Sequence, residues 1–277
     1  MILVTGATGN VGRELIAQLR AANQAVRALV RAPGAVGEVD TAVANLDQPA
    51  SLEPALRGVR GVFLLGGHRD MPGVVAELGR AGVERVVLLS SRSVIGGDPD
   101  NAIVEMWLAS EAAVRASGLA WTIVRPSGFH SNTLRWRSQL RAGDVVRVAF
   151  ADVAIAAIDP YDIAAVAAAA LTSDGHAARS HELSGPAPVT PADQLQVLAG
   201  VLARPLRLEP LHGDAARAEL ARTFPPRFVD AQLRFFAAGE FDDARVVATV
   251  TELTGRAPRT FAQWAAAHAD EFPRRAS

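Results

Sequence analysis

The sequence predicts an α/β protein with a doubly wound parallel sheet and a small, mostly helical C-terminal region. Over the first two thirds of its 277 residues, short runs rich in β-branched residues alternate with longer stretches of Ala, Leu, Arg and Glu, which is the pattern of strand-helix-strand units. The short runs are almost continuously apolar, as expected for strands that helices cover on both faces. With 49% hydrophobic residues, a chain of this length can bury one large core.

Six apolar runs are expected to form the strands of this sheet, at residues 2–4, 25–30, 41–44, 61–65, 85–89 and 121–124. The helices are expected between and after them, at residues 10–22, 49–56, 72–81, 102–116 and 160–171. Glycine follows two of these helical stretches, at Gly82 and Gly118, and glycine is a common helix stop at that place. The elements therefore follow one another in the order that a parallel sheet requires.

A stretch rich in proline and glycine, residues 184–191, marks the best place for a boundary. We expect a first domain at residues 1–185, with strand and loop insertions from about residue 129, and a second region at residues 186–277. Helices are expected in the second region at residues 191–202, 214–222, 227–238 and 260–269. This tail is too small to be an independent enzyme, so we expect it to cover the carboxyl edge of the sheet and complete a substrate pocket.

Composition excludes several classes of protein. The formal net charge is −1 and the arginines are scattered among acidic residues, so direct binding of nucleic acid is not expected. The sequence contains no cysteine and no lysine, which excludes disulfides, thiolate nucleophiles and Schiff-base chemistry. The histidines show no ligand spacing, so no metal site is expected. Any redox chemistry must therefore come from a bound cofactor.

The N-terminal residues predict the compartment. Met1 leads straight into an apolar strand without a basic leader, and no apolar stretch of about 18 residues follows anywhere in the chain. We therefore expect a cytoplasmic protein that does not insert into membranes.

Three glycines lie in the segment MILVTGATGNVGRELIAQLR, directly after the first apolar run and at the start of an amphipathic stretch. In a turn between a strand and a helix, one glycine permits the tight bend, another lets backbone N–H groups approach a pyrophosphate, and the third allows close packing of the helix. The helix N-terminus also favours an anion. The sequence therefore predicts a Rossmann-type dinucleotide site with contacts from Gly6, Thr8, Gly9, Asn10, Val11 and Gly12.

Two residues beyond this loop bear on which dinucleotide binds. Arg31 ends the second strand, where an NAD enzyme would place an acidic residue to bind the ribose hydroxyl, whereas arginine suits the 2′-phosphate of NADP(H). We therefore expect NADP(H). Asp47 follows the third strand and has two interpretations that stay open: it faces the adenine edge, or it caps the helix that begins near Pro49.

The remaining candidates lie in loops at the carboxyl ends of the strands, where ligands bind in open α/β sheets. We expect cofactor contacts from Leu65, Gly66, Gly67, Ser90 and Pro126, and a substrate pocket that includes His68, Phe129 and His130. His68 and His130 are the nearby side chains that titrate around neutrality, and we take His130 as a candidate catalytic residue. The alternative, a histidine that is only a polar loop residue, stays open.

Four segments carry a resemblance to a known family: TGATGNVG at residues 5–12, LLSS at 88–91, SGLAWTIVRP at 117–126 and DPYDIA at 159–164. They resemble the NmrA-like proteins, which are atypical short-chain dehydrogenases/reductases, and the resemblance spans nearly the whole chain. It implies a Rossmann-type fold and an NAD(P)H cofactor. Members of that family include NADPH:quinone reductases, isoflavone-reductase-like enzymes, and catalytically silent NADP-binding redox sensors that act through protein partners.

The resemblance also bears on catalysis. Ser90 or Ser91 matches the position of the family's catalytic serine, whose hydroxyl could donate to a substrate carbonyl; a serine that only satisfies the loop backbone is the alternative. Typical short-chain reductases add a Tyr-x-x-x-Lys pair, and Ile103 and Trp107 hold those two positions here, so the usual acid is missing. We expect Trp107 to add an apolar wall to the pocket. The single tyrosine, Tyr161, is expected to be structural.

The leading hypothesis is an NADPH-dependent oxidoreductase that transfers hydride to a quinone or a related flat, conjugated small molecule. Such an acceptor is electrophilic, so the protein need only hold two rings face to face while a proton follows from solvent. Two alternatives stay open: a catalytically silent NADP(H)-binding redox sensor with a regulatory protein partner, and a non-redox biosynthetic tailoring enzyme on the same fold. A homodimer is a further open expectation.

Overall fold

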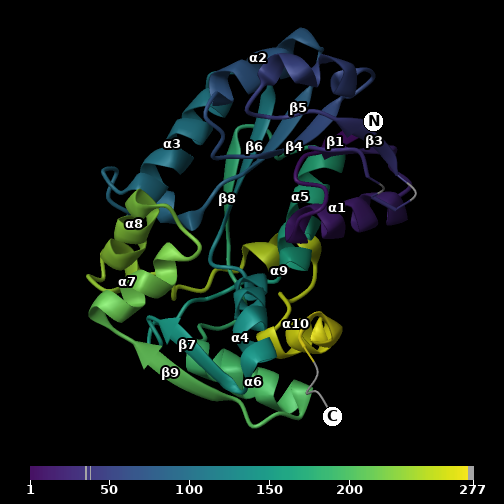
Figure 1. The fold of residues 1–277 in the computed structure, drawn as a ribbon. Coiled ribbons are helices and arrows are strands. Elements are labelled where there is room, and N and C mark those ends of the chain that lie inside the picture. The colour runs from purple at the N-terminus through teal and green to yellow at the C-terminus, as the bar shows by residue number, and fades with distance from the viewer. Residues whose placement is uncertain (35, 38, 274–277) are drawn as a thin grey trace.

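The centre of the fold is a sheet of seven parallel strands (Figure 1). The structure, a computed structural model, describes residues 1–34, 36–37 and 39–273. The strand order is β3-β2-β1-β4-β5-β6-β8, and every neighbouring pair is parallel. The order reverses between β1 and β4, the point at which doubly wound sheets bind ligands. This confirms the predicted fold class. The strands are β1 Ile2–Val4, β2 Val26–Val30, β3 Asp40–Val43, β4 Gly61–Leu65, β5 Arg85–Leu89, β6 Ala120–Pro126 and β8 Arg179–Leu183.

Successive residues of the central strands enter two separate cores, one on each face of the sheet. Ile2 and Val4 pack in one core with residues of α1, α5 and α9, whereas Leu3 packs in the other with residues of η1, α2 and α3. Burial on both faces is the reason that the strands are continuously apolar. The covering elements are α1 Asn10–Ala21, α5 Pro160–Thr172 and α9 Thr249–Thr254 on one face, and the 3₁₀ helix η1 Pro49–Leu56, α2 Met71–Arg80 and α3 Ala102–Arg115 on the other.

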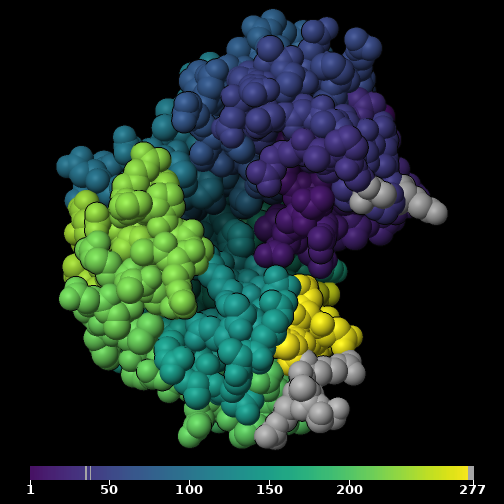
Figure 2. Space-filling model, viewed as in Figure 1, coloured from purple at the N-terminus to yellow at the C-terminus, as the bar shows by residue number. Residues whose placement is uncertain are grey.

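A second, mostly helical region lies beside the carboxyl edge of the sheet (Figure 1) and has its own core around Trp136, Leu140, Leu198 and Trp264. Its two strands, β7 and β9, pair in parallel. In the space-filling view the surface is hollowed between this region and the N-terminal part of the chain (Figure 2). The elements of this region are η3 His130–Trp136, α4 Arg137–Ala142, β7 Val145–Ala149, α6 Pro191–Leu202, β9 Arg207–Leu211, α7 Gly213–Ala221, α8 Pro226–Phe236, α10 Phe261–Ala267 and η4 Ala269–Glu271. A further short 3₁₀ helix, η2 Arg92–Val94, follows β5 and contacts α3.

The differences from the sequence-based prediction concern edge and short elements. β8, with the polar sequence RSHEL, lies at the edge of the sheet, where incomplete burial removes the apolar signal. β7, β9, α4 and α9 are five or six residues long, too short to show a periodic pattern. Residues 49–56 form a 3₁₀ helix rather than an α-helix, since Pro54 within it lacks a backbone N–H.

The division between residues 185 and 186 stays a prediction. All seven strands of the large sheet precede it, but α9 follows it and packs on α5 of the first part. In the part of the chain that the structure describes, no helix is long and apolar enough to cross a membrane.

Candidate active site

The turn between β1 and α1 forms a cradle that depends on glycine. Gly6 has φ +61°, and a Cβ atom at Gly12 would lie 2.2 Å from the Gly6 carbonyl oxygen, so α1 packs directly on the turn. Gly9 begins α1 without a side-chain cap from any described residue, and no acidic residue lies in the first helical turn. The first N–H groups of α1 are therefore available to a pyrophosphate, and the cradle fits the backbone requirements of a dinucleotide.

The neighbouring residues of the cradle differ in what they can offer. Thr8 and Asn10 are exposed, whereas Val11 is buried, so Val11 can contact a ligand only through its backbone. At the end of β4, Leu65 covers the turn, since a Cβ atom at Gly6 would lie 2.5 Å from Leu65 Cδ1. Their contacts with a cofactor stay predictions.

The two residues that bear on cofactor choice lie at the ends of neighbouring strands. Arg31 directly follows β2 and is exposed, with no ion pair to a carboxylate of the described residues. Asp47 Oδ1 lies 3.1 Å from His68 Nδ1, and this hydrogen bond is the main cause that lowers the pKa of Asp47. Gln48, not Asp47, occupies the cap position of η1, so the capping interpretation of Asp47 is wrong. His68 faces Asp47 and is not among the residues that line the cavity described next.

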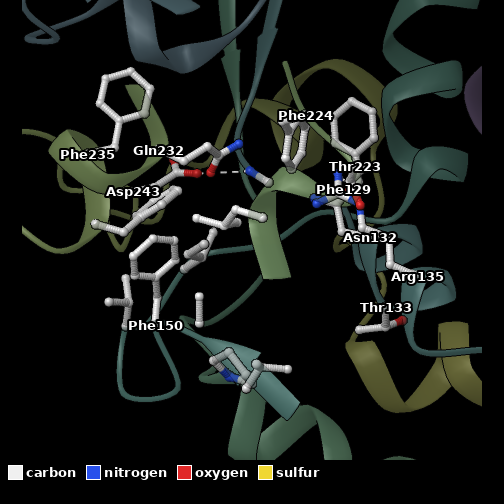
Figure 3. Close-up of a pocket in the computed structure, with 18 of the residues that line it drawn as sticks. Phe129, Asn132, Thr133, Arg135, Phe150, Thr223, Phe224, Gln232, Phe235 and Asp243 are labelled. Carbon is white, nitrogen blue, oxygen red and sulfur yellow. Dashed lines mark hydrogen bonds between the residues drawn. The ribbon is translucent and has the colours of Figure 1, made fainter. Parts of the chain in front are cut away.

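A cavity of about 840 Å³ lies between the carboxyl edge of the sheet and the second region. One wall comes from the strand ends and α3, and includes Ser91, Ile103, Trp107, Pro126 and Phe129. The rest of the lining comes from the second region; Figure 3 shows Phe224 beside Phe129, and Phe150 and Phe235 on the other side of the cavity. Sequence segments that are far apart therefore enclose one space of the size that a small-molecule ligand occupies.

The wall formed by α3 is apolar, as expected from its sequence. Ile103 and Trp107, one helical turn apart, both line the cavity. Trp107 packs against Gly66, where a Cβ atom would lie 2.8 Å from the indole ring, and Gly67 N–H donates to Ser110 Oγ at 2.9 Å. These contacts fix the loop after β4 against α3. Tyr161 lies elsewhere, with the guanidinium of Arg259 3.4 Å from its ring, in agreement with a structural role.

The two serines after β5 have different surroundings. Ser90 is 2% exposed, and its hydroxyl donates to Glu111 Oε1 at 2.7 Å. Burial would raise the pKa of Glu111, but hydrogen bonds from Arg125 and Ser90 outweigh burial and lower it, so this carboxylate holds the Ser90 proton. Ser91 Oγ instead accepts from Ser93 N–H at 3.2 Å and Ser93 Oγ at 3.0 Å. Its own proton is available to the cavity, which favours Ser91 over Ser90 as the donor to a substrate.

His130 lies in a different environment from the one expected. Its side chain is 1% exposed and contacts the rings of Phe261 and Trp264 at 5.3 and 6.3 Å between centroids. Burial lowers the pKa of His130 to about 4, so the imidazole is neutral at physiological pH. It does not line the cavity. The prediction that His130 is a catalytic residue of the pocket is therefore wrong. Its side chain packs against aromatic residues of α10 in the core of the second region.

Asp243 lines the cavity although no motif surrounds it in the sequence. It is 6% exposed, and its Oδ2 accepts a hydrogen bond from Gly128 N–H at 2.9 Å. Its Oδ1 has no hydrogen-bond partner among the described residues and lies 3.6 Å from Arg92 Nη1. The Nε atom of the same arginine lies 3.9 Å from Glu182 Oε2. Burial outweighs Arg92 and raises the pKa of Asp243 to about 6. The cavity therefore holds one carboxyl group that can carry a proton near neutral pH.

Comparison with known proteins agrees with this geometry. A family model described as NAD(P)H-binding matches residues 6–174. Over 98% of this chain and 99% of the relative, the sequence is 43% identical to a (4-alkanoyl-5-oxo-2,5-dihydrofuran-3-yl)methyl phosphate reductase of Streptomyces griseus. With the same coverage it is 33% identical to an NAD(P)H azoreductase of Xenophilus azovorans.

Solved structures show the same fold. An NADPH-dependent quinone oxidoreductase of Escherichia coli, solved with NADPH, aligns with a TM-score of 0.78 over 98% of this chain and 100% of its own, at 22% sequence identity. A triphenylmethane reductase of Citrobacter aligns with a TM-score of 0.77 over 96% and 99% of the two chains, at 20% identity. At such identities the likeness is one of fold.

Proposed function

Because this chain belongs to the NAD(P)H-binding family of atypical short-chain reductases, we propose that it is an NADPH-dependent reductase of a flat, conjugated small molecule such as a quinone or an unsaturated lactone. The observation that carries this proposal is the cavity beside the glycine cradle, with an apolar wall of Ile103 and Trp107 and a single buried carboxyl group, Asp243. A flat ring can lie against such a wall, and a dinucleotide in the cradle reaches the same edge of the sheet.

The names of the relatives support the substrate class. The Streptomyces relative acts on a dihydrofuranone that carries an alkanoyl group and a methyl phosphate group, and the Xenophilus relative is an azoreductase. A dihydrofuranone with an alkanoyl group and an azo compound both carry a double bond in a conjugated system, which accepts hydride readily. We infer that the present chain acts on an acceptor of this electronic type.

The residues that would hold the cofactor are those of the cradle and of the strand ends. Backbone N–H groups of residues 10–12 would bind the pyrophosphate, since the Gly9 N–H donates to the Gly6 carbonyl oxygen at 2.8 Å, and Arg31 would bind the 2′-phosphate that distinguishes NADPH from NADH. When bound, NADPH supplies a hydride. Pro126 and Ser91 line the cavity where the sheet ends, so the substrate ring would lie there, between the cofactor and Trp107.

The protein's own contribution to the chemistry is the handling of charge and proton. Hydride addition to a conjugated C=C–C=O system or a quinone leaves a negative charge on oxygen, and the Ser91 hydroxyl can donate a hydrogen bond to that oxygen. Asp243 can then give the proton that completes the two-electron reduction. With a pKa of about 6, roughly a tenth of this group is protonated at neutral pH. An isolated ketone is a poorer hydride acceptor, because no conjugated double bond spreads the negative charge that hydride leaves on its oxygen, and Ile103 and Trp107 hold the positions of the usual Tyr-x-x-x-Lys pair without its charge.

The test is anaerobic NADPH oxidation, followed by nicotinamide absorbance, with 1,4-naphthoquinone, an α-acyl unsaturated lactone, an azo dye and a simple aryl ketone. We expect turnover of the conjugated acceptors and none of the ketone. Binding of NADPH in calorimetry without turnover of any conjugated acceptor would contradict the proposal and favour the redox-sensor alternative. In that case the affinities for NADPH and NADP⁺ should differ clearly and a protein partner should respond to the difference. The cytoplasmic location and the homodimer stay predictions.

A further inference from the structure

Among the described residues, Arg135 is the cavity arginine that forms no ion pair with a carboxylate. It lies in η3 and lines the cavity, and no carboxylate of the described residues is within ion-pair distance of its guanidinium. Its one polar contact is a long one, from Nη2 to Asn132 Oδ1 at 3.4 Å, and its guanidinium carbon lies 5.1 Å from the centroid of the Phe224 ring. The charge therefore lacks a counter-ion.

The other arginines of the cavity provide the contrast. Arg147 pairs with Glu209 at 3.1 Å, and Arg222 pairs with Glu219 at 3.2 Å. The arginine side chain of each pair is more than half exposed. Each of these two charges is therefore neutralised by a carboxylate near the protein surface. The single unneutralised arginine is the one that points into the space between η3 and the segment before α8.

The surroundings of Arg135 favour an anion there. Arg135 is exposed, and the atoms packed near its guanidinium desolvate it in part, which lowers its pKa. Arginine nevertheless stays protonated at any physiological pH. Within a cavity, an oxyanion is the partner that a guanidinium binds best, because its N–H groups match the positions of the oxygens. Figure 3 shows Asn132 and Thr223 on the same side of the cavity as Arg135, and Asp243 on the opposite side.

We propose that Arg135, with the side chains of Asn132 and Thr223, binds a compact oxyanion carried by the substrate, of the phosphate type. The inference rests on the proposed function and makes it narrower: the substrate is a conjugated molecule with an anionic substituent. The two ends of the cavity then have separate tasks, since Arg135 holds the charged end while the ring lies toward Trp107 and Asp243. The carboxylate of Asp243 would repel an anion, which fixes the direction in which such a molecule enters.

Calorimetry can test the anion site without turnover. The full-length chain, saturated with NADP⁺, is titrated with 1-naphthyl phosphate and with 1-naphthol, which differ only in the anion. We expect the phosphate to bind about tenfold or more tightly, the scale of a charge-assisted hydrogen bond. Arg135→Gln should abolish this preference, Arg135→Lys should restore part of it, and inorganic phosphate alone should compete weakly.

Arg137→Gln is the matched control. Arg137 lies two residues further along the chain, pairs with Glu271 at 3.2 Å and does not line the cavity, so its loss removes the same charge from the surface and should leave the preference intact. Equal affinity of wild type and Arg135→Gln for 1-naphthyl phosphate, with unchanged thermal unfolding and NADP⁺ binding, would overturn the proposal. Failure of the reductase proposal gives a different result: no turnover of any acceptor, with the anion preference still present.

Discussion

The glycine cradle and the far wall of the cavity are built by different means. The cradle is made of backbone: Gly6 and Gly12 lie so close together that a Cβ atom at Gly12 would be 2.2 Å from the Gly6 oxygen. By the far wall we mean the cavity lining that the second region provides on both sides, with side chains from η3, α8 and the coil around Asp243. A site formed by backbone groups accepts few kinds of ligand, because its geometry depends on the fold. A site formed by side chains can change its ligand specificity when single residues are replaced. The cradle should therefore fail sharply under substitution, and the far wall should change specificity.

The largest effect is expected at Gly12. Gly12→Val would push α1 away from the turn, and its N–H groups would no longer meet the pyrophosphate. Loss of two charge-assisted hydrogen bonds predicts that NADPH affinity falls by about 100-fold or more, measured by calorimetry. Gly79→Ala in α2, where a Cβ atom meets nothing within 4 Å, is the control and should bind NADPH as wild type does. Near-normal NADPH binding by Gly12→Val would contradict the claim that the cradle depends on the close backbone contact at Gly12.

The next effect is expected at Asp243, where the change should fall on kcat rather than on cofactor binding. Asp243→Asn keeps an acceptor for Gly128 N–H but removes the proton, so we expect kcat to fall by about 100-fold. Since burial raises the pKa of Asp243 to about 6, wild-type kcat should decline as the pH rises through that value, and the variant should show no such decline. A variant with an unchanged pH profile and near-normal kcat would remove Asp243 from the proposed chemistry.

The raised pKa of Asp243 also makes the free energy of unfolding depend on pH. The pKa of Asp243 rises from 3.8 to about 6 on folding, so the folded protein binds this proton more tightly than the unfolded chain. Its contribution to the free energy of unfolding is therefore present below about pH 4 and is lost as the pH rises through about 6. Urea unfolding at several pH values should show this loss in wild type and not in Asp243→Asn.

A smaller effect should separate the two serines. Ser91→Ala removes the hydroxyl proton that faces the cavity and the acceptor of two hydrogen bonds from Ser93, so we expect kcat to fall about tenfold and the free energy of unfolding to fall by about 1 kcal/mol. Ser90→Ala removes a buried partner of Glu111, so its main effect should be a lower free energy of unfolding, by about 1 kcal/mol. Steady-state kinetics and urea unfolding on both variants decide the assignment. The reverse pattern would give the catalytic hydroxyl to Ser90.

The smallest effect is expected at the exposed Arg31. Arg31→Glu should weaken NADPH binding by about tenfold, because a single charge-assisted contact with the 2′-phosphate is lost, and NADH binding should change much less. Arg57→Glu, another exposed site, carries the same charge change and should leave the ratio of the two affinities unaltered. An equal loss for NADPH and NADH would show that Arg31 does not read the 2′-phosphate.

The two sites also differ in how far the sequence predicts them. Gly6, Gly9 and Gly12 fall within one short segment, so strand, turn and helix can be identified together. Trp107 could be placed through the family resemblance, because its helix begins and ends at clear signals. Local patterns also predict six of the seven strands, β1 to β6.

The far wall gives no such signal. Arg135 and Asp243 become a cation and an acid of one cavity only when segments about a hundred residues apart meet, and an Asp-Asp pair in a coil otherwise resembles ordinary surface. His130 was misplaced for the same reason. Its ring packs against Phe261 and Trp264 of α10, and the sequence around His130 gives no sign of these distant contacts.

The hydrogen bond from Gly128 N–H to Asp243 has a consequence for the order in which the molecule is completed. On the ribosome, the loop after β6 emerges more than a hundred residues before its partner. All seven strands of the sheet and the glycine cradle are therefore made before Asp243, although α9, which packs on α5, is made after it. Chains that end before residue 243 should therefore bind NADPH but reduce the acceptor slowly, because the residue that donates the proton is missing.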